Sequence, residues 1–190
     1  LIAFTIEAAN KSGVFDRVIL STDDQEIADV TKRYGGEVPF MRPAELAEDK
    51  TPHLPVMQHA VRWLKDNEGY EPDFVAILQP TAPLRQAFHL QEAVDLLKKT
   101  GADSVVAMVE IPGHHSPYWA VKVDEQGLGT LLLSDDPIRR RIPRRQDLPK
   151  AYTHSGALYL FKTSFLDMPE PNFYGDKVAA YVMDEKFNVN

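Results

Sequence analysis

Short apolar runs alternate with amphipathic segments along most of this chain. Runs rich in Val, Ile, Leu and Phe predict strands at 17–21, 37–40, 74–78, 103–111, 156–161 and 178–183. Apolar residues at helical spacing predict helices at 1–10, 53–65 and 86–99, and another that runs from the N-cap candidates Thr22 and Asp23 to Tyr34. Because strands and helices alternate, we expect an α/β fold of three α/β/α layers with a mostly parallel, mixed sheet.

The alternation breaks near position 114. From His114 to Lys150 the pattern predicts only short strands, at 118–123 and 130–133, with Gly turns and a basic stretch. We interpret 114–150 as an excursion within one domain that spans 1–190. The first helix has no N-cap before Leu1, and the last residues still alternate like a strand, so the domain is expected to be truncated at both ends.

Composition narrows the class of protein. The 190 residues carry a net charge of −7, are 44% hydrophobic and contain no cysteine. These values are ordinary for a globular domain, and they exclude disulfides and thiolate metal sites. We find no run of about eighteen apolar residues and no signal peptide, so we expect a cytoplasmic protein that does not contact the membrane. The acidic balance argues against nucleic acid as a partner.

The run Ile77-Leu78-Gln79-Pro80-Thr81-Ala82-Pro83-Leu84-Arg85 holds the strongest candidate chemistry. It directly follows a predicted buried strand, and ligands of open α/β sheets bind at the carboxyl ends of strands. The two prolines stiffen the turn, so that Gln79, Thr81 and Arg85 would offer an amide, a hydroxyl and a cation to an anionic ligand such as a nucleotide. The alternative interpretation is a rigid connector between a strand and a helix.

Arginines are concentrated in one part of this acidic chain. Five of them fall between positions 139 and 145: Arg139, Arg140, Arg141, Arg144 and Arg145. Guanidinium groups match carboxylates and phosphates, so the segment could grip an anionic substrate. A contact between subunits, or a solvated loop, explains the same pattern. A nucleic-acid patch is less favoured because the segment has few aromatic residues for stacking.

Several separated segments, taken together, resemble one family. They are Leu1–Ala9, Val18–Ala28, Tyr34–Ala47, Leu78–Arg85, Arg145–Pro149 and Ser155–Tyr159. In this order they are similar to the acylneuraminate cytidylyltransferases, the CMP-sialic acid synthetase family, and to the relatives that act on pseudaminic and legionaminic acids. The resemblance covers nearly the whole chain.

The resemblance implies a nucleotide-diphospho-sugar transferase-like fold in which residues 114–150 form a protruding dimerisation arm. It also implies an enzyme that transfers CMP from CTP to a nine-carbon 2-keto sugar acid and releases pyrophosphate, with the help of Mg²⁺. The expected partners are CTP, the sugar acid and a second copy of the chain.

The resemblance also implies roles for particular residues. Arg42 would lie beside the nucleotide, and Gln79 would hydrogen-bond the sugar. Arg145 would reach the sugar carboxylate from the partner subunit, and Tyr159 would lie near the sugar pocket. Asn190 aligns with the first of two metal-binding aspartates, so it is the expected metal ligand, although an amide brings no charge to the ion. No catalytic residue is identified.

Departures from the family pattern leave two questions open. The family's Gly-rich and basic phosphate loop would precede Leu1 and is absent from this sequence. Residues 49–56 look closer to the pseudaminic branch, whereas 79–81 and 156–159 look closer to the sialic or legionaminic branch. The sugar therefore stays undecided. A catalytically inactive relative, which acts as a nucleotide-binding or dimeric interaction module, is the alternative function.

Overall fold

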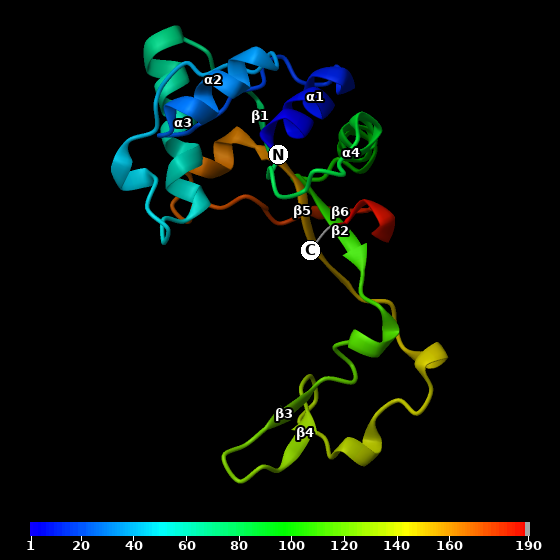
Figure 1. Ribbon diagram of the computed structural model, residues 1–190. Coiled ribbons are helices and arrows are strands. Elements are labelled where there is room, and N and C mark those ends of the chain that lie inside the picture. The colour runs from blue at the N-terminus through cyan, green and yellow to red at the C-terminus, as the bar shows by residue number, and fades with distance from the viewer. Residues whose placement is uncertain (189–190) are drawn as a thin grey trace.

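The computed structural model describes residues 1–188; Figure 1 shows its sheet, the flanking helices and one projecting arm. The main sheet has the order β1-β5-β2-β6. Its strands are Phe74–Ile77 (β1), Ser104–Glu110 (β2), Tyr152–Lys162 (β5) and Val178–Val182 (β6). β2 and β6 are parallel, whereas β5 is antiparallel to both β1 and β2. Three of the four strands thus share one direction, which confirms the expected mixed α/β sheet.

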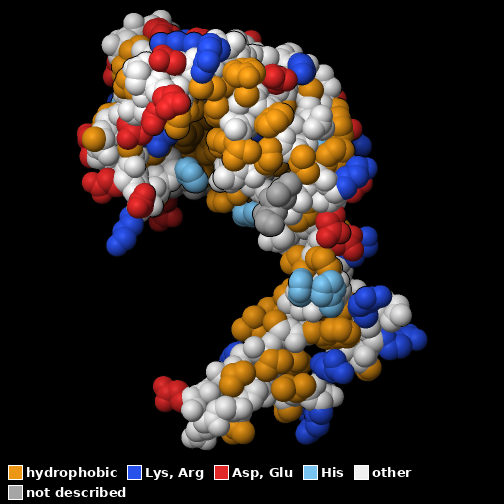
Figure 2. Space-filling view, in the orientation of Figure 1, with side chains coloured by type: hydrophobic (Ala, Val, Ile, Leu, Met, Phe, Trp, Pro, Cys, Tyr) orange, Lys and Arg blue, Asp and Glu red, His pale blue; other side chains and the backbone are white. Residues whose placement is uncertain are grey.

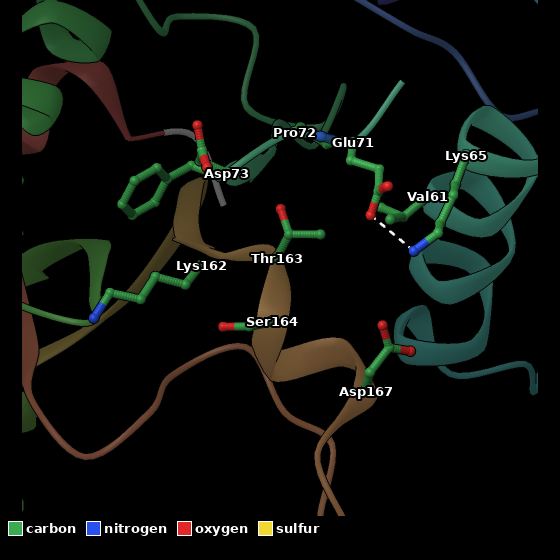
Figure 3. Close-up of a pocket in the computed structure, with 10 residues that line it drawn as sticks. Val61, Lys65, Glu71, Pro72, Asp73, Lys162, Thr163, Ser164 and Asp167 are labelled. Atoms are coloured by element: carbon green, nitrogen blue, oxygen red, sulfur yellow. Dashed lines mark hydrogen bonds and ion pairs between the residues drawn. The ribbon is translucent and has the colours of Figure 1, made fainter. Parts of the chain in front are cut away.

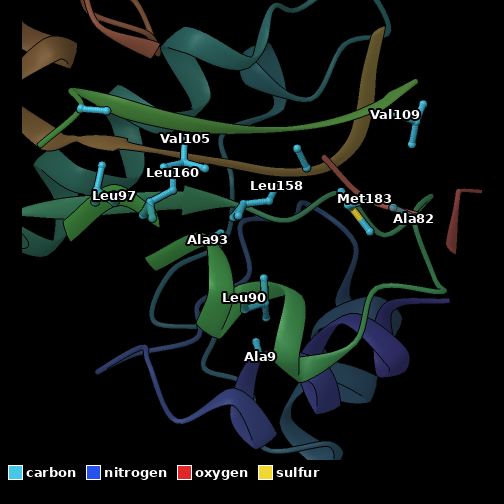
Figure 4. Close-up of a cluster of buried hydrophobic side chains, with 13 residues drawn as sticks. Ala9, Ala82, Leu90, Ala93, Leu97, Val105, Val109, Leu158, Leu160 and Met183 are labelled. Carbon is cyan, nitrogen blue, oxygen red and sulfur yellow. The ribbon is translucent and has the colours of Figure 1, made fainter. Parts of the chain in front are cut away.

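Two helices, α1 and α4, cover one face of this sheet (Figure 1). The helices of the domain are Ile2–Ser12 (α1), Gln25–Arg33 (α2), His53–Glu68 (α3) and Ala87–Thr100 (α4). Residues three or four apart on α4 pack against alternate residues of β2 and β5 (Figure 4): Leu90, Ala93, Leu97, Val105, Ala107, Val109, Leu158 and Leu160. These are the periods of a helix and a strand that each bury one face.

The opposite face of the sheet is covered by the segment 163–177 and by α3. Phe161 points to this side, and its ring centroid lies 5.0 Å from that of Phe173. The Gln58 side chain of α3 donates a hydrogen bond of 2.7 Å to the main-chain oxygen of Leu166. The sheet therefore lies between two covering layers, as the alternation of elements predicts. The short 3-10 helices are Ala44–Leu46, Gly113–His115, Ile138–Arg140, Arg145–Asp147, Thr163–Asp167 and Glu185–Phe187.

The strands predicted at 17–21 and 37–40 are reduced to one parallel bridge, between Ile19 and Glu37. Two main-chain hydrogen bonds of 2.8 Å flank the bridge. Arg17 anchors its start, since its guanidinium hydrogen-bonds the carboxylates of Glu37 and Glu68. The prediction of two full strands is wrong, because apolar patterning does not show whether a pairing partner lies alongside.

Helix ends also differ from the sequence expectation. The N-cap of α2 is Asp24, not Thr22 or Asp23: its carboxylate accepts a hydrogen bond of 2.9 Å from the Ile27 amide. Helix α3 continues to Glu68 and ends where Gly69 adopts a left-handed conformation with φ of 64°. A glycine at this position ends a helix at little steric cost.

Residues 112–150 leave the sheet and form the arm seen in Figure 1. Its hairpin consists of the antiparallel strands β3 (Val121–Val123) and β4 (Gly129–Leu131). Large apolar side chains of the arm face solvent in this chain, and Val123 and Leu133 are 66% and 59% exposed. Figure 2 shows these apolar groups next to basic side chains. In the part of the chain that the structure describes, no helix has the length and apolar character to cross a membrane.

Candidate functional site

Gln79 lies just beyond the carboxyl end of β1, where the proline-containing loop begins. Ile77, the last residue of β1, pairs with Tyr159 in the middle of β5. Two of the predicted site residues are thus brought together at one end of the sheet: Gln79 just after β1, and Tyr159 on the neighbouring β5. This is the end at which an open α/β sheet binds ligands.

A bulge in β5 lies beside Gln79. The register between β2 and β5 shifts between Val106, which pairs with Tyr159, and Met108, which pairs with His154. Within the shifted part, Gly156 has φ of 71°, which residues with a side chain rarely adopt. A Cβ on Gly156 would lie only 2.6 Å from Oε1 of Gln79. The backbone conformation therefore favours glycine there, and the lack of a side chain leaves room for the Gln79 amide.

Tyr159 belongs to a small aromatic group on the side of the sheet opposite α4. The ring centroids of His154 and Tyr159 lie 5.8 Å apart, and those of His154 and Tyr174 lie 6.3 Å apart. Burial raises the pKa of the Tyr159 phenol, and Tyr174 adds to the shift. The phenol is therefore neutral at pH 7, so it can both donate and accept hydrogen bonds to a polar ligand.

Arg85 does not offer a free cation, contrary to the sequence expectation. It is 2% exposed, and its guanidinium donates to the main-chain oxygen of Ala157 at 2.6 Å and to Oγ1 of Thr5 at 2.8 Å. Both terminal nitrogens also lie 3.3 Å from the main-chain oxygen of Gln79. Burial without a carboxylate partner lowers the pKa of Arg85 to about 10. The side chain joins α1, the loop and β5 rather than facing solvent.

Arg42 is held on another segment. Its Nε donates to Oγ of Ser21 at 3.1 Å, and Nη2 donates to the Ser21 carbonyl. Its main-chain amide donates to the oxygen of Thr22 at 2.8 Å. The guanidinium is therefore oriented by the segment that follows the Ile19 bridge, and it makes no direct hydrogen bond to Gln79 or Tyr159 among residues 1–188.

Arg145 lies on the arm and not on the sheet. Its aliphatic stem crosses Gly113, where an added Cβ would come within 2.7 Å of Cγ of Arg145. Three of the other arm arginines have partners within the arm: Arg140 pairs with Asp136, Arg144 pairs with Asp147, and Arg141 lies over the Trp119 ring. The structure of one chain thus leaves Arg145 apart from Gln79 and Tyr159.

The expected metal ligand, Asn190, lies outside the described residues. Among residues 1–188, no three His, Asp or Glu side chains are arranged so that they could hold a metal ion.

A cavity of about 510 Å³ lies at the other end of the β1–β5 pair. It is lined near the start of β1 by Asp73 and Phe74 and near the end of β5 by Lys162 and Thr163, with α3 opposite (Figure 3). An ion pair between Lys65 of α3 and Glu71 spans 2.8 Å at its wall. Because this cavity is at the amino end of β1, it is not the site that the proline-containing loop predicts.

Sequence reasoning missed two parts of the site, the buried position of Arg85 and the role of Gly156. A signal existed for Arg85: it lies just before the amino end of α4, where a positive charge is opposed by the helix dipole. A cation at this position does not stabilise the helix, so its presence points to interactions with other parts of the chain. A signal also existed for Gly156, because a glycine within a predicted strand often marks a bulge, but its contact with the Gln79 loop could not be read from the local sequence.

Comparisons with known proteins identify the family of this chain. The family model described as "Cytidylyltransferase" matches residues 1–187. The pseudaminic acid cytidylyltransferase of Campylobacter jejuni is 32% identical over 184 residues, which are 96% of this chain and 75% of the relative. The CMP-N,N'-diacetyllegionaminic acid synthase of the same species is 31% identical over 185 residues, 97% of this chain and 75% of the relative.

A solved structure shares the fold. The CMP:2-keto-3-deoxy-manno-octonic acid synthetase complexed with CTP superposes with a TM-score of 0.53 at 16% identity. The match covers 86% of this chain and 65% of that one. Because the family model matches nearly the whole of this chain, the chain belongs to the cytidylyltransferase family.

Proposed function

We propose that this protein transfers CMP from CTP to the anomeric hydroxyl of a nine-carbon 2-keto sugar acid and releases pyrophosphate. The observation that carries the proposal is the position of Gln79, at the carboxyl end of β1 and against the β5 bulge, in a chain of the cytidylyltransferase family. The relatives named for pseudaminic and legionaminic acids support the substrate class.

In the proposed reaction the anomeric oxygen attacks the α-phosphorus of CTP and forms a new phosphorus–oxygen bond. The bond between the α-phosphorus and the bridging oxygen to the β-phosphate breaks, and pyrophosphate leaves with the electron pair. The hydroxyl proton passes to water. Such steps depend mainly on positioning and on neutralising charge.

The residues of the site suit these tasks. Arg42, which Ser21 orients, would lie beside the nucleotide as a fixed cation. The Gln79 amide and the neutral Tyr159 phenol would hydrogen-bond the hydroxyl groups of the sugar. Polar side chains that the fold already holds in place lose little conformational entropy when they bind a substrate.

A homodimer is part of the proposal. Exposed apolar side chains on the arm, such as Val123 and Leu133, would be buried by a second copy. Arg145 would then reach the sugar carboxylate of the partner subunit. This explains why a predicted site residue lies on the arm, apart from Gln79 and Tyr159.

We also propose that Mg²⁺ accompanies the nucleotide and that Asn190 is one of its ligands. A divalent cation would neutralise part of the charge of the triphosphate. Because CTP is a substrate, the cytoplasm is the proposed compartment.

The sugar is proposed only as a class. The pseudaminic and legionaminic relatives are 32% and 31% identical to this chain, so similarity does not favour either branch.

The deciding experiment measures pyrophosphate release from CTP with Mg²⁺, with sialic, legionaminic and pseudaminic acids in parallel. Release with one of them identifies the enzyme and its sugar together. Binding of CTP without release from any sugar would instead support the inactive, nucleotide-binding relative.

A further inference from the structure

Arg85 joins its own loop to two elements that are distant in the sequence. Its hydrogen bonds reach Thr5 on α1, Ala157 on β5 and the main-chain oxygen of Gln79. With 2% exposure it has no room for a ligand. Its planar, forked donor group can serve several carbonyl oxygens at once, which a lysine ammonium cannot do with the same geometry.

The charge of Arg85 is not balanced by an acidic group. None of the ion pairs among residues 1–188 includes it, and its Nε has no hydrogen-bond partner there. Burying a cation without a carboxylate partner costs folding free energy, so packing alone does not explain why an arginine occupies this position. The cost suggests a task that a neutral side chain could not perform.

Gln79 lies between Arg85 and the β5 bulge. Its main-chain oxygen accepts from Arg85, and its side-chain Oε1 lies against Gly156. Gly156 is followed by Ala157, whose oxygen is the nearest acceptor of Arg85 at 2.6 Å. One guanidinium therefore fixes the distance between the loop that carries Gln79 and the bulge against which the Gln79 amide rests.

We propose that Arg85 is a positioning residue for the sugar subsite: by holding the Gln79 loop against the β5 bulge, it sets the place of the Gln79 amide without touching substrate. The inference rests on the proposed function, since it assigns the sugar as the ligand of Gln79. It predicts that Arg85 acts on sugar recognition through Gln79 and has little effect on CTP.

The test is a double-mutant cycle between Arg85→Lys and Gln79→Ala, with KM measured separately for the sugar acid and for CTP. We expect Arg85→Lys to raise the KM for the sugar about tenfold, as for loss of a charged hydrogen bond, and to leave the KM for CTP within about twofold. In the Gln79→Ala background, Arg85→Lys should have almost no further effect.

Two further variants keep the test decisive. Thr5→Ala removes one acceptor of Arg85 but keeps the charge, so it should raise the KM for the sugar in the same direction by a smaller factor. It replaces Arg85→Lys in the cycle if the latter does not fold. Arg17→Lys is the matched control, because Arg17 is also an arginine of a structural network, with Glu37 and Glu68. It should lower the Tm and change neither KM.

Additive effects of the two substitutions on the KM for the sugar, or equal rises in both KM values, would overturn the positioning role. Wild-type protein that releases no pyrophosphate with any sugar acid would instead remove the proposed function, and the inference with it. The two failures are distinguishable, because the first requires an active wild-type enzyme.

Discussion

The sheet domain and the arm use apolar residues in opposite ways. In the sheet domain, Leu90 and Val105 are almost fully buried, and each packs against a neighbouring element of the same chain. On the arm, Val123 and Leu133 are more than half exposed. The apolar residues of the sheet domain thus contribute to its own folding, whereas those of the arm stay exposed in a single chain, as a contact surface would require.

Truncation of a buried side chain should give the largest effect. Leu90→Ala creates a cavity between α4 and the sheet, and we expect the free energy of unfolding to fall by about 3 kcal/mol. Urea denaturation measures it. Leu133→Ala, at an exposed position of the arm, is the control and should change the free energy of unfolding by less than about 0.5 kcal/mol in the monomer. Equal losses would contradict the contrast between the two regions.

Charge placed on the arm should act on association and not on folding. Val123→Glu with Leu133→Glu would put carboxylates into the proposed interface, and we expect the dimer Kd to rise by at least about a hundredfold. Sedimentation velocity at several concentrations measures it, and circular dichroism checks that the sheet domain is intact. An unchanged Kd would show that this face of the arm is not the interface, whereas a monomeric wild type would remove the dimer altogether.

Arg145→Ala tests whether the arm completes the site. Loss of a charged contact to the sugar carboxylate should raise the KM for the sugar by about tenfold, with little change in the KM for CTP. Arg144→Ala is the matched control, because that side chain is already paired with Asp147. If both variants raise the KM equally, the effect comes from the net charge of the arm.

The smallest effect concerns pH and lies in the sheet domain. The Lys162 ammonium, followed by the Lys177 amide, holds the pKa of the Asp103 carboxyl below its ordinary value of 3.8. Its contribution to stability is therefore present above pH 3.8 and is lost as the pH falls through the lower, folded-state pKa. Asp103→Asn should lower the Tm slightly at pH 7, and the difference from wild type should shrink in strong acid. A difference that grows in acid would contradict this sign.

The residues of the candidate site could be proposed from the sequence, but the contacts that orient them could not. The loop from Gln79 to Arg85 follows a strand as predicted, and Tyr159 lies on the neighbouring strand. The placement of Arg85 was wrong because a local pattern shows which groups a loop carries, and not which of them turn inward. Its acceptors on Thr5 and Ala157 are remote in the sequence.

The layers of this protein can be read from local patterns. Val105, Ala107 and Val109 repeat with period 2, and Leu90, Ala93 and Leu97 with period 3.6, because a strand and a helix each bury one face. Which polar groups stay accessible to a ligand, by contrast, depends on how the elements pack. The fit of Gln79 against Gly156 and the burial of Arg85 depend on segments that approach through folding, and such long-range contacts leave no periodic trace in the chain.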